Sequence, residues 1–359
     1  MFDPTTPFNE LPHIPPEITF DDVDILKKVN KANIALSNLN GASLAVPNIK
    51  LLIEPLTVRE AVASSGIENI NTTVADVFRA ELFPIETVSH AQKETLHYRE
   101  ALLYGFKTIN DRGFLNTNSF IEIQNYLEPN KPGIRKLPGT KIQNQITGDV
   151  LYAPPDGEDL IRKLLANYEQ YYNDGSDDVD PLIKNAILHY QFEAIHPFYD
   201  GNGRTGRILM VLHLILSKRL LLPVLFISGY LHKNRTDYYN LLRGVTAENN
   251  WKDWILFVLN AIEEQSKSTM KTINIILIMH NDYTERIKKE SQPVYSADLV
   301  NYLFSAAFYT QENLSKKIDV HVNTAAKYLN VLEQAGLLKS IRIKREKVYF
   351  IEGFIEILS

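Results

Sequence analysis

Residues 192–210, which read FEAIHPFYDGNGRTGRILM, place several chemically active side chains within twelve positions of one another. His196 is a candidate general base, because imidazole titrates near neutral pH without help from its surroundings. Asp200 could hold a magnesium ion together with phosphate oxygens, the ligands that this ion prefers. Arg204 and Arg207 add two guanidinium forks that fit phosphate oxygens. The combination indicates a site that handles a polyphosphate.

The glycines of this stretch, Gly201, Gly203 and Gly206, also match the phosphate-loop pattern G-x-G-x-x-G. A dinucleotide-binding turn would need a preceding strand and an acidic residue about 20 positions later. The preceding residues have a helical pattern, and no Asp or Glu lies between Gly201 and Thr236. The H-R-D and D-F-G partners of a kinase loop and the lysine of a P-loop are absent as well. The glycines instead predict a tight loop whose N–H groups bind an anion at a helix start.

The twelve residues from His196 to Arg207, HPFYDGNGRTGR, resemble the signature of the Fic family, H-P-F-x-D/E-G-N-G-R-x-x-R, at every defined position. The resemblance covers Leu56 to Ile262. It implies a mainly α fold, with a helical Fic core and a β-hairpin flap. It also implies a protein adenylyltransferase, which moves AMP from ATP to a hydroxyl side chain of a target protein and releases pyrophosphate.

Carried over by position, the resemblance makes His196 the general base and Asp200 the ligand of Mg²⁺, while Phe198 anchors the loop in the core. It implies that Asn202 and the loop amides cradle the phosphates and that both arginines bind the outer ones. The implied nucleotide-binding positions are Gly201, Asn202, Gly203, Arg204, Thr205, Gly206 and Arg207. Phosphate-transferring relatives depart from the G-N-G-R-x-x-R ending that this chain keeps. That favours AMP transfer over the alternative of phosphate transfer with an inverted nucleotide.

Two further segments fit the family. The stretch PGTKIQNQITGDVLYAPP predicts a hairpin of strands Lys141–Gln145 and Val150–Ala153 around a turn at residues 147–149. It resembles the family's flap, to which an extended segment of the target protein adds as a strand. Downstream, NRTDYYNLLRGV resembles the lining of the adenosine pocket. Tyr239 is the residue expected near the base or ribose, with Tyr238 turned elsewhere.

Upstream, the stretch VASSGIENI is similar to the family's inhibitory motif, Ser/Thr-x-x-x-Glu-Gly/Asn, with Ser64, Glu68 and Asn69 at the defined positions. Ser64 and Glu68 would lie one helical turn apart on the same face. The resemblance implies that Glu68 pairs with Arg207 and occupies the fork that the γ-phosphate needs. The enzyme would then be autoinhibited by a helix that precedes the core in the same chain.

The residue pattern along the whole chain predicts four regions. These are an extended Pro-rich leader (1–20), an N-terminal helical region with the inhibitory helix (21–115), the catalytic core with its flap at about 139–153 (116–270), and a C-terminal winged helix-turn-helix domain (285–359). In the last of these, Asn323 is expected to cap the recognition helix and Gly336 to end it. The recognition helix offers only Lys327 as a cation, with Glu333 opposing it. The expected wing carries the basic residues Lys339, Arg342, Lys344, Arg345 and Lys347.

Composition narrows the choice of partners. The net charge of -5 gives no general reason to expect nucleic acid. The apolar stretch from Ile208 is broken by Ser217, Lys218, Arg219 and Pro223, which argues against a membrane span. The absence of cysteine suits a reducing compartment, and a cytoplasmic location is expected. The expected partners are a protein carrying a Ser, Thr or Tyr hydroxyl, the chain itself through self-modification, and a second copy in a homodimer. The alternative is a DNA-binding transcription regulator whose core senses nucleotide.

Overall fold

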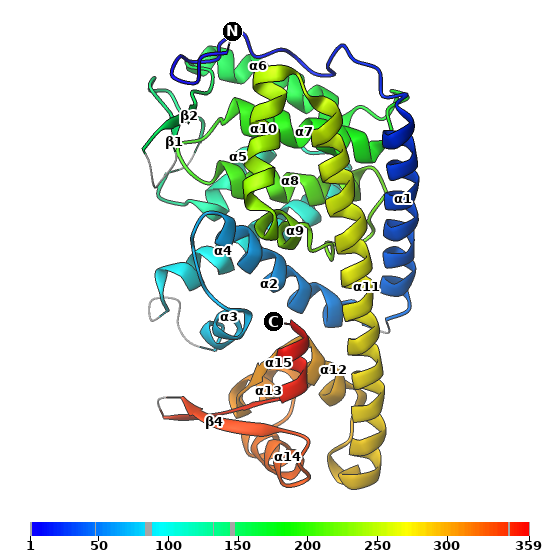
Figure 1. Cartoon of the computed structure of the whole chain (residues 1–359). Helices are drawn as coiled ribbons and strands as arrows, with labels where there is room; N and C mark the ends of the chain where they lie inside the picture. The colour runs from blue at the N-terminus through cyan, green and yellow to red at the C-terminus, as the bar shows by residue number, and fades with distance from the viewer. Residues whose placement is uncertain are drawn as a thin grey trace.

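The computed structural model describes residues 2–46, 48–82, 88–131, 133–143, 148–343 and 345–358, which form the mainly helical architecture that the sequence predicted (Figure 1). The helices up to the end of the core are α1 (Val23–Leu44), α2 (Lys50–Ile67), α3 (Val74–Ala80), α4 (His90–Arg112), α5 (Thr117–Leu127), α6 (Glu158–Asn173), α7 (Pro181–Ile195), α8 (Asn202–Leu216), α9 (Ile227–Lys233), α10 (Arg235–Glu248) and α11 (Trp251–Glu290). None of the helices in these described ranges is long and apolar enough to cross a membrane.

The centre of the core is the pair α7 and α8. Both helices are apolar on nearly every face, and both are buried along almost their whole length, as expected for helices surrounded by others. Asp180 caps the first turn of α7, and Pro181 occupies the first helical position, where its missing N–H costs nothing. The short loop between α7 and α8 carries the motif and is therefore held at both ends by buried helices.

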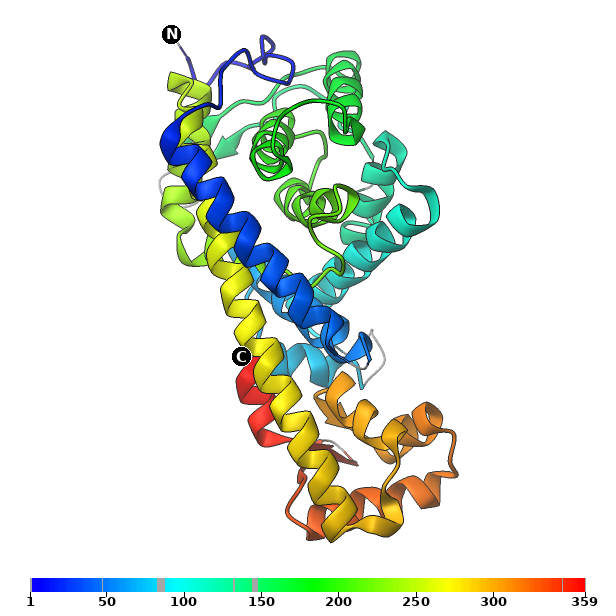
Figure 2. The ribbon, with the colours of Figure 1, turned by 90° about the vertical axis from the view of Figure 1, so that its right-hand side faces the viewer.

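Two long helices, α1 and α11, lie side by side along one face of the molecule (Figure 2). Lys28 of α1 forms an ion pair of 2.6 Å with Glu263 of α11. The 40-residue α11 also spans residues 270–285, between the predicted core and the predicted C-terminal domain. One continuous helix thus connects the two parts.

The predicted hairpin is present between α5 and α6. Strands β1 (Ile142–Gln143) and β2 (Val150–Tyr152) are antiparallel, and Ile142 lies opposite Tyr152. Strand β1 begins one residue later than expected, and β2 ends one residue earlier. Residues 144–147, which include the end of the first predicted strand and Thr147 of the predicted turn, lie outside the described residues.

Beyond α11, the chain forms a smaller unit that packs against α2 and α3. Its elements are η2 (Gln292–Val294), α12 (Ala297–Ser305), β3 (Phe308–Tyr309), α13 (Gln311–Ile318), α14 (Val322–Gln334), β4 (Lys339–Ile343), β5 (Glu346–Phe350) and α15 (Glu352–Leu358). The described strands pair in the order β3-β5-β4, all antiparallel.

Residues 308 and 309 form strand β3, where both aromatic side chains are buried and the backbone pairs with β5. One expectation for this unit was wrong. The cap of α14 is His321 rather than Asn323: its ring Nδ1 accepts the backbone N–H of Asn323, which lies inside the first turn. Gly336 follows the end of α14 with φ of +70°, the left-handed backbone expected of a residue that ends a helix.

Candidate active site

The motif loop is held in place by hydrogen bonds and by packing against neighbouring residues. His196 ends α7 with φ of 48°, and its carbonyl accepts a 2.8 Å hydrogen bond from Nε of the buried Arg135. Phe198 is fully buried, as predicted for the anchor of the loop. The side chain of Asn202 accepts from the N–H of Phe198 and donates to its carbonyl, each at 2.8 Å. Asn202 therefore shapes the loop, and its amide is occupied by the backbone.

The loop leads into the N-terminus of α8, where backbone N–H groups lack partners within the helix. Gly201 enters the helix with φ of +78°. A Cβ atom at Gly203 would lie 2.4 Å from Oε1 of Glu68, so only glycine allows that carboxylate to come this close. The carboxylate of Glu68 thus sits at the anion-binding end of α8.

Glu68 forms the predicted ion pair with Arg207, with Oε1 2.8 Å from the guanidinium. Ser64 binds the same arginine: its Oγ accepts from Nε at 2.8 Å, and its carbonyl accepts from Nη2 at 3.0 Å. Burial is the largest influence and raises the pKa of Glu68, but the charge and the hydrogen bond of Arg207, together with the charge of Arg204, outweigh it and hold that pKa below the usual value. Asn69 follows with φ of 61° and accepts a 2.7 Å hydrogen bond from Arg235. The carboxylate of Glu68 is therefore ionised at the start of α8.

A second glutamate, Glu60, holds α2 in place, the helix that carries Ser64 and leads to Glu68. Glu60 of α2 is buried and accepts hydrogen bonds from the N–H of Ser228 at 3.0 Å, from its hydroxyl at 2.5 Å and from the hydroxyl of Tyr98 at 3.2 Å. Burial raises the pKa of Glu60 to about 7 despite these bonds. Glu60 precedes Ser64 and Glu68 by one and two helical turns, so the three side chains share one face of α2.

A prediction follows for stability against pH. Because the pKa of Glu60 is higher in the folded chain, the unfolded chain loses this proton first as pH rises, and stability falls between the ordinary carboxyl range and about pH 7. The slope from one such group approaches about 1.4 kcal/mol per pH unit. Melting temperatures at pH 5.5 and 7.5 should therefore differ less in Glu60→Gln than in the parent. Glu54→Gln, on the same helix but partly exposed, is the control and should behave as the parent. If the melting temperature changed equally between pH 5.5 and 7.5 in all three proteins, the raised pKa of Glu60 would be contradicted.

His196 lies within this buried setting. Burial, followed by the positive charge of Arg135, lowers the pKa of His196 to about 4. Its imidazole is therefore neutral at physiological pH and able to accept a proton.

Asp200 and Arg204 have partners that the sequence did not indicate. The carboxylate of Asp200 lies 2.6 Å from Nζ of Lys131, and its other oxygen accepts the N–H of Gly201 at 2.8 Å. Arg204 was expected to bind outer phosphates. Its guanidinium is instead 3% exposed and paired at both ends, with Glu94 of α4 and, at 2.5 Å, with Glu128 after α5. This geometry corrects the expectation, because no free fork remains for a phosphate, and Arg204 ties α8 to its neighbours.

Thr205 and Gly206 also face the protein. The hydroxyl of Thr205 donates to the carbonyl of Gly201 at 2.8 Å and is fully buried. A Cβ at Gly206 would lie 2.4 Å from Oε1 of Glu193, so this glycine makes room for a carboxyl group of α7. These two residues of the predicted nucleotide-binding set therefore build the loop and its packing.

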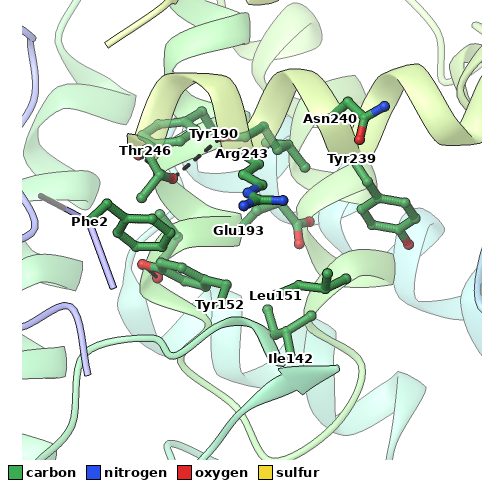
Figure 3. Close-up of a pocket in the computed structure, with 12 residues that line it drawn as sticks. Phe2, Ile142, Leu151, Tyr152, Tyr190, Glu193, Tyr239, Asn240, Arg243 and Thr246 are labelled. Atoms are coloured by element: carbon green, nitrogen blue, oxygen red, sulfur yellow. Dashed lines mark hydrogen bonds between the residues drawn. The ribbon is translucent and has the colours of Figure 1, made fainter. Parts of the chain in front are cut away.

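A cavity of about 140 Å³ opens between the flap, α7 and α10 (Figure 3). Its walls are mostly apolar and aromatic, with Glu193 and Arg243 as the charged residues among those that line it: Phe2, Ile142, Leu151, Tyr152, Tyr190, Glu193, Ala194, Tyr239, Asn240, Leu242, Arg243 and Thr246. Tyr239 lines this cavity, whereas Tyr238 is buried and forms a hydrogen bond of 2.9 Å with Nε2 of His189. The mostly apolar lining with two charged residues suits a ligand that has an apolar face and a few polar groups.

Sequence reasoning missed Glu193. It lies one helical turn before His196, and its Oε1 is buried without a hydrogen-bond partner among the described residues. Burial raises the pKa of Glu193 to about 7. The signal in the sequence was its spacing of only three residues from the base.

Comparisons with known proteins agree with this geometry. Family models match the chain as Fic/DOC family N-terminal over residues 26–107, Fic/DOC family over residues 114–214, and protein adenylyltransferase SoFic-like, C-terminal domain, over residues 279–353. Protein adenylyltransferase Fic of Drosophila grimshawi is 28% identical over 161 residues, which are 44% of this chain and 30% of that protein. The protein of the same name from Drosophila melanogaster is 29% identical over 137 residues, which are 38% and 25% of the two chains. The chain thus spans less than a third of the length of these curated relatives.

Solved structures show the same fold. A Fic family protein from Desulfovibrio desulfuricans G20 superposes with a TM-score of 0.55 at 19% identity, covering 94% of this chain and 98% of that chain. Fic-1 from C. elegans superposes with a TM-score of 0.51 at 19% identity, covering 70% and 72%. The similarity to the first of these structures extends over nearly the whole length of both chains.

Proposed function

Because this chain belongs to the Fic family, we propose that it is a protein adenylyltransferase that transfers AMP from ATP to a hydroxyl side chain of a target protein and is held inactive by Glu68. The observation that carries the proposal is the motif loop. The loop carries the neutral imidazole of His196 and leads into the start of α8, and Glu193 and Ala194 of α7, just before the loop, line the cavity together with Ile142 and Leu151 of the hairpin.

The proposed position of ATP follows from these features. Its phosphates would bind the N–H groups at the start of α8, including that of Gly203. The outermost phosphate would pair with Arg207 once Glu68 has left that guanidinium. The nucleoside would fill the cavity beside Tyr239, where the unpartnered carboxyl of Glu193 can meet its polar groups.

The chemistry proposed for His196 is a proton transfer. The imidazole takes the proton of the target hydroxyl while the hydroxyl oxygen attacks the α-phosphorus of ATP. The bond from that phosphorus to the oxygen bridging to the β-phosphate then breaks, and pyrophosphate leaves. The rigid loop contributes by positioning and by oriented N–H dipoles, which are the main source of catalysis in this class of reaction.

Asp200 fits the magnesium ion that the family uses. Its carboxylate is 42% exposed beside the loop, and magnesium keeps several waters while binding one or two carboxylates and phosphate oxygens. Within the described ranges, no three His, Asp or Glu side chains group to hold a metal without other ligands. We therefore propose that the ion binds jointly to Asp200 and ATP, where it would neutralise phosphate charge.

The flap supplies the proposed docking edge for the target, through main-chain bonds to an extended segment bearing Ser, Thr or Tyr. Modification of the chain itself and formation of a homodimer are both compatible with this reaction. The use of ATP as the AMP donor favours the cytoplasm as the place of action. The C-terminal unit has the helix and strand order of a winged helix. We propose docking rather than DNA binding for it, because Lys347 pairs with Glu333 and Lys339 with Glu352.

The test is to compare ATP labelled on the α-phosphate with ATP labelled on the γ-phosphate. The full-length Glu68→Gly protein is incubated with each, alone and with a cell lysate. The proposal expects protein-bound label from the α-phosphate only, with none in Glu68→Gly combined with His196→Ala. Label from the γ-phosphate would show phosphate transfer instead. ATP binding without transfer of either label would favour the nucleotide-sensing regulator.

A further inference from the structure

The N-terminal segment, residues 2–18, begins at the cavity assigned to the nucleoside, where Phe2 is one of the lining residues. Its prolines prevent regular secondary structure, and it crosses the surface of the core in an extended path that buries Leu11 and Ile14. Figure 1 shows this part of the chain passing from the flap toward the start of α1. The segment is thus part of the folded core.

Hydrogen bonds fix this path at several points. The side chain of Asn167 accepts from the N–H of Ile14 and donates to its carbonyl, both at 2.9 Å. Gln191 of α7 donates to the carbonyl of Pro12 at 2.9 Å. Asn9 accepts the N–H of Asp156 at 2.8 Å, just beyond the flap. Such hydrogen bonds to backbone groups fix the position of the chain, which apolar packing alone does not do.

The first residues of the N-terminal segment pack against the flap hairpin. The N–H of Phe8 donates to the carbonyl of Ala153, directly after β2, at 2.9 Å. The ring of Phe8 packs edge-on against Tyr152 at 6.4 Å, and the ring of Phe2 lies nearly parallel to Tyr152 at 6.1 Å, with 26° between the planes. Tyr152 in turn donates from its hydroxyl to the carbonyl of Ala194 at 2.8 Å, which fixes its ring.

Phe2 and Tyr152 both line the cavity, and Figure 3 shows the two rings side by side along its wall. Aromatic rings present flat apolar faces, against which a nucleobase packs favourably. We propose that residues 2–18 belong to the nucleotide site, with Phe2 forming the outer wall of the nucleoside cavity and Phe8 holding the flap beneath it. This inference rests on the proposed function, because it places adenosine in that cavity.

The test measures equilibrium binding of two ligands, ATP and inorganic tripolyphosphate, to full-length proteins that all carry Glu68→Gly. Phe2→Ala should weaken ATP binding about tenfold, as expected for loss of one aromatic contact to a base, and leave tripolyphosphate binding unchanged. Phe8→Ala should act in the same direction, and Phe2→Trp should keep ATP affinity. Phe114→Ala removes an aromatic ring that is 45% exposed elsewhere on the surface and should have no effect.

The possible results separate a failure of this inference from a failure of the proposed function. An ATP affinity unchanged by Phe2→Ala would overturn the inference while leaving the proposed function intact. Equal weakening of both ligands would show that the segment acts through the overall fold, which would also overturn it. If the parent bound neither ligand, the nucleotide site itself would be wrong, and the inference with it. Melting temperatures of all variants identify any loss of folding.

Discussion

Replacing Glu68 with glycine should raise the initial rate of AMP transfer by roughly a hundredfold. In the structure, Glu68 places a carboxylate against the start of α8 and occupies the guanidinium of Arg207. It therefore blocks two groups that should stabilise the phosphates and adds a negative charge beside them. Its removal frees the N–H groups and the arginine together. The measurement is the initial rate of α-label incorporation at saturating Mg-ATP.

The matched control is Glu81→Gly. Glu81 also follows the last residue of a helix, α3, and also pairs with an arginine of a neighbouring helix, Arg99. It makes no contact with the motif loop, so its loss should leave the transfer rate unchanged. Equal rates in wild type and Glu68→Gly would contradict inhibition by this carboxylate. A higher final level of AMP with an unchanged initial rate would indicate that Glu68 acts in removing AMP.

Local pattern and resemblance predicted much of this site. The contact between Glu68 and Arg207 joins residues 139 positions apart, and it was expected because two short motifs each fix one end. The anchor Phe198 and the hairpin next to it followed from similar reasoning. In each case a short motif lies within a single stretch of the chain, and the family resemblance implied how the motifs come together.

The partners of Arg204 could not be predicted in this way. Glu94 and Glu128 come from α4 and from the end of α5, and nothing in their local sequence distinguishes them from surface carboxylates. They meet Arg204 only because of how those helices pack on α8. The same holds for Phe2, which reaches the cavity through a path fixed by hydrogen bonds to distant side chains. Such contacts are properties of the tertiary fold rather than of any single window of sequence.

Replacing His196 with alanine in the Glu68→Gly protein should lower the transfer rate by about 10²–10⁴-fold, the usual contribution of a general base, while ATP binding stays the same. His90→Ala is the control, because the side chain of His90 is 85% exposed at the start of α4. A loss of ATP binding in His196→Ala would instead assign the imidazole to holding the nucleotide.

The pH dependence tests the same assignment more sharply. Burial and Arg135 lower the pKa of His196 to about 4, and a base acts in its unprotonated form. The rate should therefore stay flat as pH falls from 8 to 6 and decline only toward pH 4, whereas an ordinary histidine would lose most of its activity by pH 6. Glu193, whose pKa is raised to about 7, could add its own inflection, so the profile is measured in Glu193→Gln as well. A fall near pH 6.5 that persists in Glu193→Gln would show that His196 titrates as a solvated imidazole during the reaction. That result would contradict a base pre-set in its neutral form by burial and by Arg135.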